Sequence, residues 1–170
     1  GRPLVDWQND TIEDPERAGL YGALFLGRIA DVCVVEDTYD DVQYDLAEFQ
    51  DYSMEMDERE RYSGQPYLLR VQCIDRQDRT LQIHCRLTED YLHLRRGMPA
   101  TTLLLSTSPS FTQLAALTDV YVVDDAGGCW IGDYPYLDRF SMEGLLARDD
   151  ELWEALLKEA DDAITQDDVD

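Results

Sequence analysis

The residues best suited to catalysis or metal binding are His84, Cys85, Asp90 and His93. Imidazole and thiolate are good zinc ligands, and a cysteine beside a histidine base can act as a nucleophile. Adjacent residues of a β-strand, however, point to opposite faces, so His84 and Cys85 cannot share one site. The chain contains only 2 histidines. We therefore expect no catalytic residue, no metal ligand and no cofactor.

Carboxylates are so abundant that close pairs arise by chance, and they identify no acid–base site. Asp37, Asp40, Asp41 and Asp45 resemble a set of divalent-ion ligands. The glycine and the terminal glutamate of a calcium-binding loop are missing at the required offsets, so we interpret these residues as a solvated face. The Walker, GxGxxG and GxSxG motifs are also missing from the sequence.

The most distinctive string is the segment 129–137, which places Trp130, Tyr134 and Tyr136 around glycine and proline. Aromatic side chains on rigid turns are enriched at binding surfaces, because these large amphipathic groups lose little entropy there. The segment therefore predicts a partner-binding patch. In the alternative interpretation, Trp130 and Tyr136 fill one end of the core and Tyr134 caps a turn.

Among the elements that must position these side chains, the clearest is a hairpin. Two alternating runs, 67–74 and 80–87, flank a polar connection. Both runs must turn their apolar residues to the same side of the sheet. They do so if Val71 faces Cys85, which a loop of three or five residues allows.

The opposite face of this hairpin is basic. The same register places Arg70 opposite Arg86 and Gln72 opposite His84. Because like charges directly across two strands are destabilising, we expect this face to meet an anionic group. That group is either the protein's own acidic helix over 40–62 or, if the face binds a partner, an acidic segment or a phosphate.

The remaining patterns predict an α+β fold with a mostly antiparallel sheet, open or barrel-like, an acidic helix near the N-terminal third and a C-terminal helix. The first expected elements are a strand over 20–36 bent at Gly27 and a helix capped by Asp40 and ending near Tyr62. A short helix should begin at Thr88 and be closed by Gly97 and Pro99. The rest of the chain is expected to form strands over 101–107 and 120–123, a helical turn over 111–117, and a final helix capped by Asp149 or Asp150. The apolar face of the final helix is expected to hold Trp153, Leu156, Leu157, Ala160 and Ile164. Residues 1–165 are expected to form one domain and 166–170 a disordered acidic tail.

The amino-acid composition limits the classes of partner that the protein can bind. A hydrophobic content of 44% over 170 residues supports one domain with a core, while 37 acidic against 14 basic residues give a net charge of −23. The charge falls on the flanks, with −12 over 1–62 and −9 over 141–170, but −2 over 63–140. This acidity disfavours nucleic acid or an anionic membrane as the direct partner, although adaptation to high salt would also produce it. No apolar run is long enough for membrane insertion.

The 4 cysteines lie without a CxxC pair or regular spacing. We expect reduced, mostly buried thiols in preference to a disulfide or a metal site, because free cysteine commonly behaves as a small buried hydrophobe. Free thiols persist in reducing compartments, so the cysteines favour a cytoplasmic location.

These observations favour a non-catalytic, cytoplasmic protein-binding domain of the adaptor, assembly or regulatory type. Its acidic flanks would stay free and attract a basic partner, and its aromatic patch would anchor that partner. One alternative is an acidic nucleic-acid mimic that occupies a DNA- or RNA-binding protein, which requires carboxylates in an ordered stripe along the helices. A third is an enzyme with an unrecognised site, such as a pocket that joins a histidine to several carboxylates.

Overall fold

The computed structural model describes residues 21–36, 43–53, 67–106, 108, 114–117, 119–125, 127–133 and 139–169. Its strands form one sheet in the order β4–β3–β1–β5–β7–β8, with β2 beside β1 and β6 beside β5. The strands are β1 Tyr21–Glu36, β2 Gln43–Asp45, β3 Tyr67–Ile74, β4 Thr80–Arg86, β5 Pro99–Ser106, β6 Leu114–Leu117, β7 Val120–Asp124 and β8 Gly127–Ile131. All of their pairings are antiparallel, which confirms the α+β class with a mostly antiparallel sheet.

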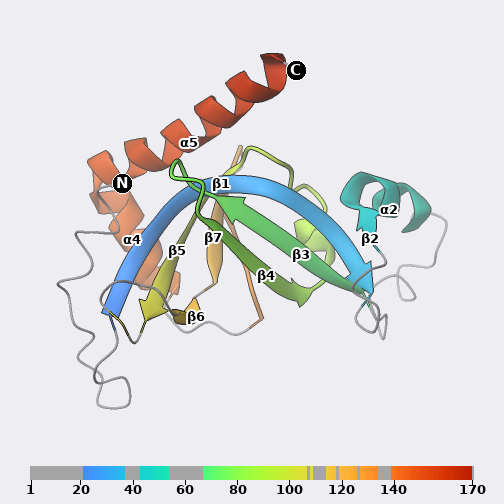
Figure 1. The fold of residues 1–170 in the computed structure, drawn as a ribbon, viewed down its shortest axis with the longest axis horizontal. Helices are drawn as coiled ribbons and strands as arrows, with labels where there is room; N and C mark the ends of the chain where they lie inside the picture. The colour runs from blue at the N-terminus through green and yellow to red at the C-terminus, as the bar shows by residue number, and fades with distance from the viewer. Residues whose placement is uncertain are drawn as a thin grey trace.

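The sheet is curved, with β1 arching across it, but it does not close into a barrel (Figure 1). β4 and β8 lie at the two ends of the strand order, and no ladder joins them in the described residues. The two ends approach through a side chain, because the backbone N–H of Arg86 is donated to both carboxylate oxygens of Asp133 at 3.2 Å. The barrel-like alternative is therefore wrong: a carboxylate takes the hydrogen bond that a closing strand would have taken.

Alternate residues of the strands face two separate apolar cores. On β1, Phe25 packs in the larger core and Leu24 in the smaller one. On β7, Val122 belongs to the larger core, whereas Tyr121 packs against the smaller one. This division follows from the two-residue period of a strand. Both faces of the sheet are thus apolar where these strands lie, and both need a cover.

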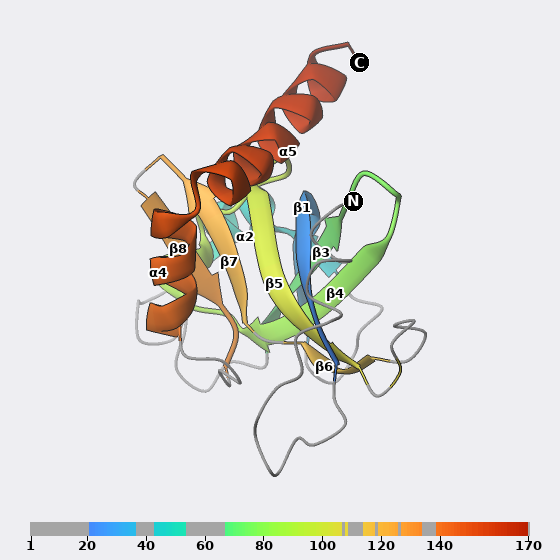
Figure 2. The ribbon, with the colours of Figure 1, turned by 90° about the vertical axis from the view of Figure 1, so that its left-hand side faces the viewer.

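Two consecutive helices, α4 (Arg139–Arg148) and α5 (Asp150–Val169), cover the smaller core (Figure 2). Leu146 and Leu156 pack there against Leu24 of β1. Asp149 separates the helices and caps α5, because its Oδ1 accepts the N–H of Leu152 at 3.0 Å. Neither helix, nor any other in the described part of the chain, combines the length and apolar character needed to cross a membrane.

The inward face of α5 differs from the expected one. Leu156 is 0% exposed, whereas Leu157, expected on the same face, is 36% exposed. Glu159 is 5% exposed instead, and its carboxylate binds Arg28 and Arg76, each at 3.2 Å. The helix is turned so that this carboxylate reaches Arg28 of β1 and Arg76 of the turn between β3 and β4. The expectation that the acidic C-terminal flank stays free is therefore wrong for this face of α5.

The helix in the N-terminal third begins later than expected. Residues 43–45 form β2 on β1, so the helix α2 runs over Leu46–Ser53. Oδ1 of Asp45 accepts the N–H of Ala47 at 2.9 Å, which makes Asp45 the cap in place of Asp40. Residues 43–45 form backbone hydrogen bonds with β1, so they do not have to become helical to pair their N–H and C=O groups. The expected end at Tyr62 lies outside the described residues.

The β3–β4 hairpin turns its apolar residues to one side as predicted, but its register is shifted by two residues. Val71 faces Ile83, and Arg70 faces His84 instead of Arg86. The apolar pattern fixes register only to within two residues, and the turn makes the final choice. Asp75 tightens that turn by accepting backbone N–H groups of Gln77 and Arg79, each at 2.9 Å.

Two further expectations changed. β1 carries its bulge between Ile29 and Asp31, not at Gly27. Gly27 is needed for close packing, since a Cβ there would lie 2.3 Å from the carbonyl oxygen of Ile74.

The helical turn expected over 111–117 is wrong for residues 114–117, which form β6 against β5. A four-residue helix gains few hydrogen bonds for the cost of nucleation, while strand pairing satisfies both segments.

The orientation of α5 can be tested with two neighbouring leucines. Leu156→Ala is expected to lower the free energy of unfolding by about 2–5 kcal/mol, because it leaves a cavity in the smaller core. Leu157→Ala, on the exposed side, should change it by less than about 0.5 kcal/mol. Urea unfolding followed by circular dichroism measures both values, and equal losses would contradict the orientation.

Candidate binding site between the two terminal helices and the sheet

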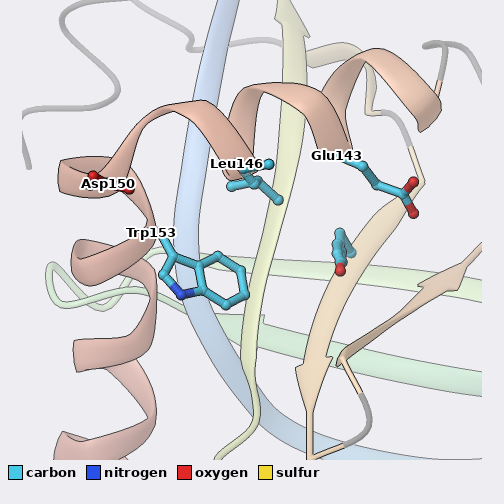
Figure 3. Close-up of a pocket in the computed structure, with 6 residues that line it drawn as sticks. Glu143, Leu146, Asp150 and Trp153 are labelled. Carbon is cyan, nitrogen blue, oxygen red and sulfur yellow. The ribbon is translucent and has the colours of Figure 1, made fainter.

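A pocket of about 320 Å³ lies where α4 and α5 meet the outer face of β7. It is lined by Tyr121, Glu143, Leu146, Ala147, Asp150 and Trp153. Figure 3 shows the Trp153 indole reaching from α5 beneath α4, with Glu143 and Asp150 on opposite sides of Leu146. The walls thus combine two aromatic rings with two carboxylates, both on exposed residues.

The local sequence explains why these side chains meet. Tyr121 alternates with Val120 and Val122, which are buried in the larger core, so its ring must emerge on the other face. The single residue between the helices, Asp149, lets α5 start immediately after α4 and fold back toward the sheet. Trp153 follows this cap by one helical turn, which places it at the corner between the helices and β7.

Trp130, singled out in the sequence as a partner anchor, is held by intramolecular contacts beside this pocket. Its ring stacks on Tyr121 with centroids 5.0 Å apart and planes at 22°. Its indole N–H is donated to Oε1 of Glu143 at 2.9 Å, and the guanidinium of Arg139 lies 5.6 Å from its ring centroid. Arg139 is itself bound to the buried carboxylate of Asp119. Trp130 therefore joins β8 to α4 and supports the pocket wall.

Electrostatics favour a cationic ligand at this pocket. Burial, followed by the negative charges of Glu143 and Asp124, raises the pKa of Tyr121. The phenol therefore stays protonated at neutral pH and keeps its hydrogen as a donor. The carboxylates of Glu143 and Asp150 offer acceptors for a positive group, and ring faces also attract cations.

The hairpin residues that sequence predicted as a partner face do not lie at this pocket. His84 and Arg86 are exposed on β4, whereas Arg70 is half-buried on β3 between Cys33 of β1 and His84. Arg70 makes a hydrogen bond to Cys33, but its buried Nε has no partner. Tyr134 and Tyr136 lie outside the described residues.

A carboxylate of the C-terminal helix pairs with two other arginines of the protein. It is Glu159 of α5, and it binds Arg28 and Arg76. The arginine pair Arg70 and Arg86 does not form across the hairpin, because the register separates them.

The histidines and thiols are dispersed. His84 is exposed and Cys85 is 1% exposed, as strand alternation requires. His93 instead contacts Asp124, with Nε2 and Oδ2 2.9 Å apart. Among the described residues, no three His, Cys, Asp or Glu side chains converge as metal ligands would.

Sequence reasoning missed four of the pocket's polar and aromatic residues: Tyr121, Glu143, Asp150 and Trp153. They come from three elements that meet only in the folded chain. The one available signal was the spacing of Asp150 and Trp153, which places a carboxylate and an aromatic ring on neighbouring positions of a helix.

Trp130→Ala is expected to lower the free energy of unfolding by about 2 kcal/mol, because it removes the stack on Tyr121 and the hydrogen bond to Glu143. Trp130→Phe keeps a ring and should cost about 1 kcal/mol, the value of the lost hydrogen bond. Chemical unfolding measures both. A Trp130→Ala protein as stable as the parent would contradict a supporting role for this side chain.

Burial raises the pKa of both Cys73 and Cys85 to about 12. Since only the thiolate reacts, iodoacetamide at neutral pH should leave both residues unmodified in the native protein, while half-buried Cys129 reacts slowly. In urea all four cysteines should react. Peptide mapping by mass spectrometry gives the extent at each site, and rapid native labelling of Cys85 would contradict its burial.

Comparison with known proteins places the chain in a family. No curated protein and no solved structure matches it. A family model, described as "Family of unknown function (DUF8619)", matches residues 5–152, which include the whole sheet and α4. The chain therefore belongs to this family of unknown function.

Proposed function

We propose that the chain is a non-catalytic protein-binding domain, of the adaptor, assembly or regulatory type, that recognises a partner with a basic surface. The observation that carries the proposal is the pocket between α4, α5 and β7, whose walls pair carboxylates with aromatic rings. A cytoplasmic location is part of the proposal and agrees with four free cysteines, three of them buried.

The outer surface of α4 and α5 supports this proposal. Exposed carboxylates of Glu143, Asp150, Glu151 and Glu154 lie along these two helices. A cluster of one sign raises the rate of encounter with an oppositely charged partner and discourages acidic competitors. The contact surface proposed here is therefore the outward side of the helices together with the pocket, since Glu159 faces the sheet.

The nucleic-acid mimic stays an alternative to this proposal. α5 has 20 residues, a length of about 30 Å, and could follow a stretch of phosphates. The inward turn of Glu159 interrupts its row of acids, however, which counts against an ordered stripe.

The proposal can be tested by capture from the lysate of the source organism at low and at high ionic strength. We expect a specific partner with a basic surface, which binds the purified protein directly and is released by salt. The triple variant Glu143→Gln, Asp150→Asn, Glu154→Gln should weaken this binding about tenfold.

A matched triple variant, Asp78→Asn, Asp90→Asn, Asp125→Asn, removes the same charge at exposed positions outside α4, α5 and the pocket lining and should bind like the parent. Equal weakening by both variants would show that net charge alone drives binding. A partner that duplex DNA displaces competitively would favour the mimic.

A further inference from the structure

The geometry points to one specific ligand for the pocket: we infer that it binds a single arginine side chain of the partner, with the guanidinium at the aromatic walls and paired with the carboxylate of Glu143. This inference rests on the proposed function and narrows it to one residue type.

The size of the pocket suits one side chain. Its volume of about 320 Å³ lies at the lower end of the range of about 300–1,000 Å³ that small-molecule sites occupy. The pocket is bounded by two adjoining helices and one strand. A long side chain projecting from a partner surface can enter such a pocket, and its aliphatic part would contact Leu146 and Ala147.

The walls favour a planar cation over a compact one. Trp130 covers one face of the Tyr121 ring, which leaves Trp153 and the other face of Tyr121 for a guanidinium to stack on as well as bind electrostatically. An ammonium group cannot stack and is more strongly hydrated. Arginine should therefore bind better than lysine, although both carry one positive charge.

The carboxylate of Glu143 can receive the guanidinium without breaking its existing contact. Glu143 uses Oε1 for the indole N–H of Trp130, and a carboxylate has further acceptor positions on both oxygens. Asp150 lies on the other side of Leu146 (Figure 3). One guanidinium therefore pairs with one carboxylate, and Glu143 is the one whose charge acts on Tyr121.

The cations already present on these helices do not fill the pocket. Arg139 is bound to Asp119 and lies over Trp130. Arg148 and Lys158 are exposed and do not line the pocket.

The test is an NMR titration of the full chain with Nα-acetyl-arginine amide, with the indole N–H of Trp153 as the reporter. We expect saturable shifts of this signal with a Kd on the order of 1 mM, as suits so small a ligand. Nα-acetyl-citrulline amide has the same shape without the charge and should bind at least tenfold more weakly. Nα-acetyl-lysine amide should bind severalfold more weakly.

Variants locate the site. Glu143→Gln keeps an acceptor for Trp130, and Asp150→Asn lies on an exposed position. Glu143→Gln should weaken arginine binding about tenfold and Asp150→Asn less, whereas Glu154→Gln, on α5 but outside the pocket lining, should leave it unchanged.

Absence of a saturable Trp153 shift, or equal binding of citrulline or lysine, would overturn the arginine site. If the arginine probe fails while a purified basic partner still binds the chain and responds to the triple variant, only the site assignment is lost. Failure of both would reject the proposed function as well.

Discussion

Burial of apolar side chains on both faces of one open sheet is the constraint on which the rest of the structure depends. β1 supplies Phe25 to one core and Leu24 to the other, so the same strand must be covered twice. The larger core is closed by the curvature of the sheet and by Leu46 and Phe49 of α2. The smaller core has no such enclosure and requires α4 and α5. The pocket exists because these helices meet at the corner where β7 turns its tyrosine outward.

A buried carboxylate fixes the direction of α5 over this smaller core. Glu159 lies between Arg28 of β1 and Arg76 of the hairpin turn. Burying a charge is costly unless it is paired, so a rotation of the helix that turned Glu159 into solvent would leave the half-buried Arg28 without this carboxylate. Apolar packing holds the helix on the sheet, and this ion cluster specifies which side of the helix faces inward. The same rotation exposes Glu154 and brings Trp153 to the pocket.

Local patterns were sufficient to predict most strands and their inward faces. The alternation of β3 and β4 identified Val71 and Cys85 as core residues, and both are buried. The register of the β3–β4 hairpin and the rotation of α5 about its axis could not be predicted from these patterns. Asp75 selects the hairpin register through turn hydrogen bonds that apolar spacing does not encode. The candidate site was the least predictable part, because its aromatic and acidic residues belong to separate elements, and the aromatic residue that the sequence emphasised, Trp130, serves as a support beside it.

The carboxylate of Asp133 at the end of β4 has a consequence for self-association. A sheet with two uncovered rims can grow by adding strands from other molecules, which leads to fibres. Here the outward-pointing N–H of Arg86 is already occupied by Asp133, and the same rim carries a histidine and an arginine. A second molecule docking on this part of β4 would have to displace that acid. The Asp133 contact therefore removes one of the donors to which a strand of another molecule could bind, on the side where the sheet nearly closes on itself.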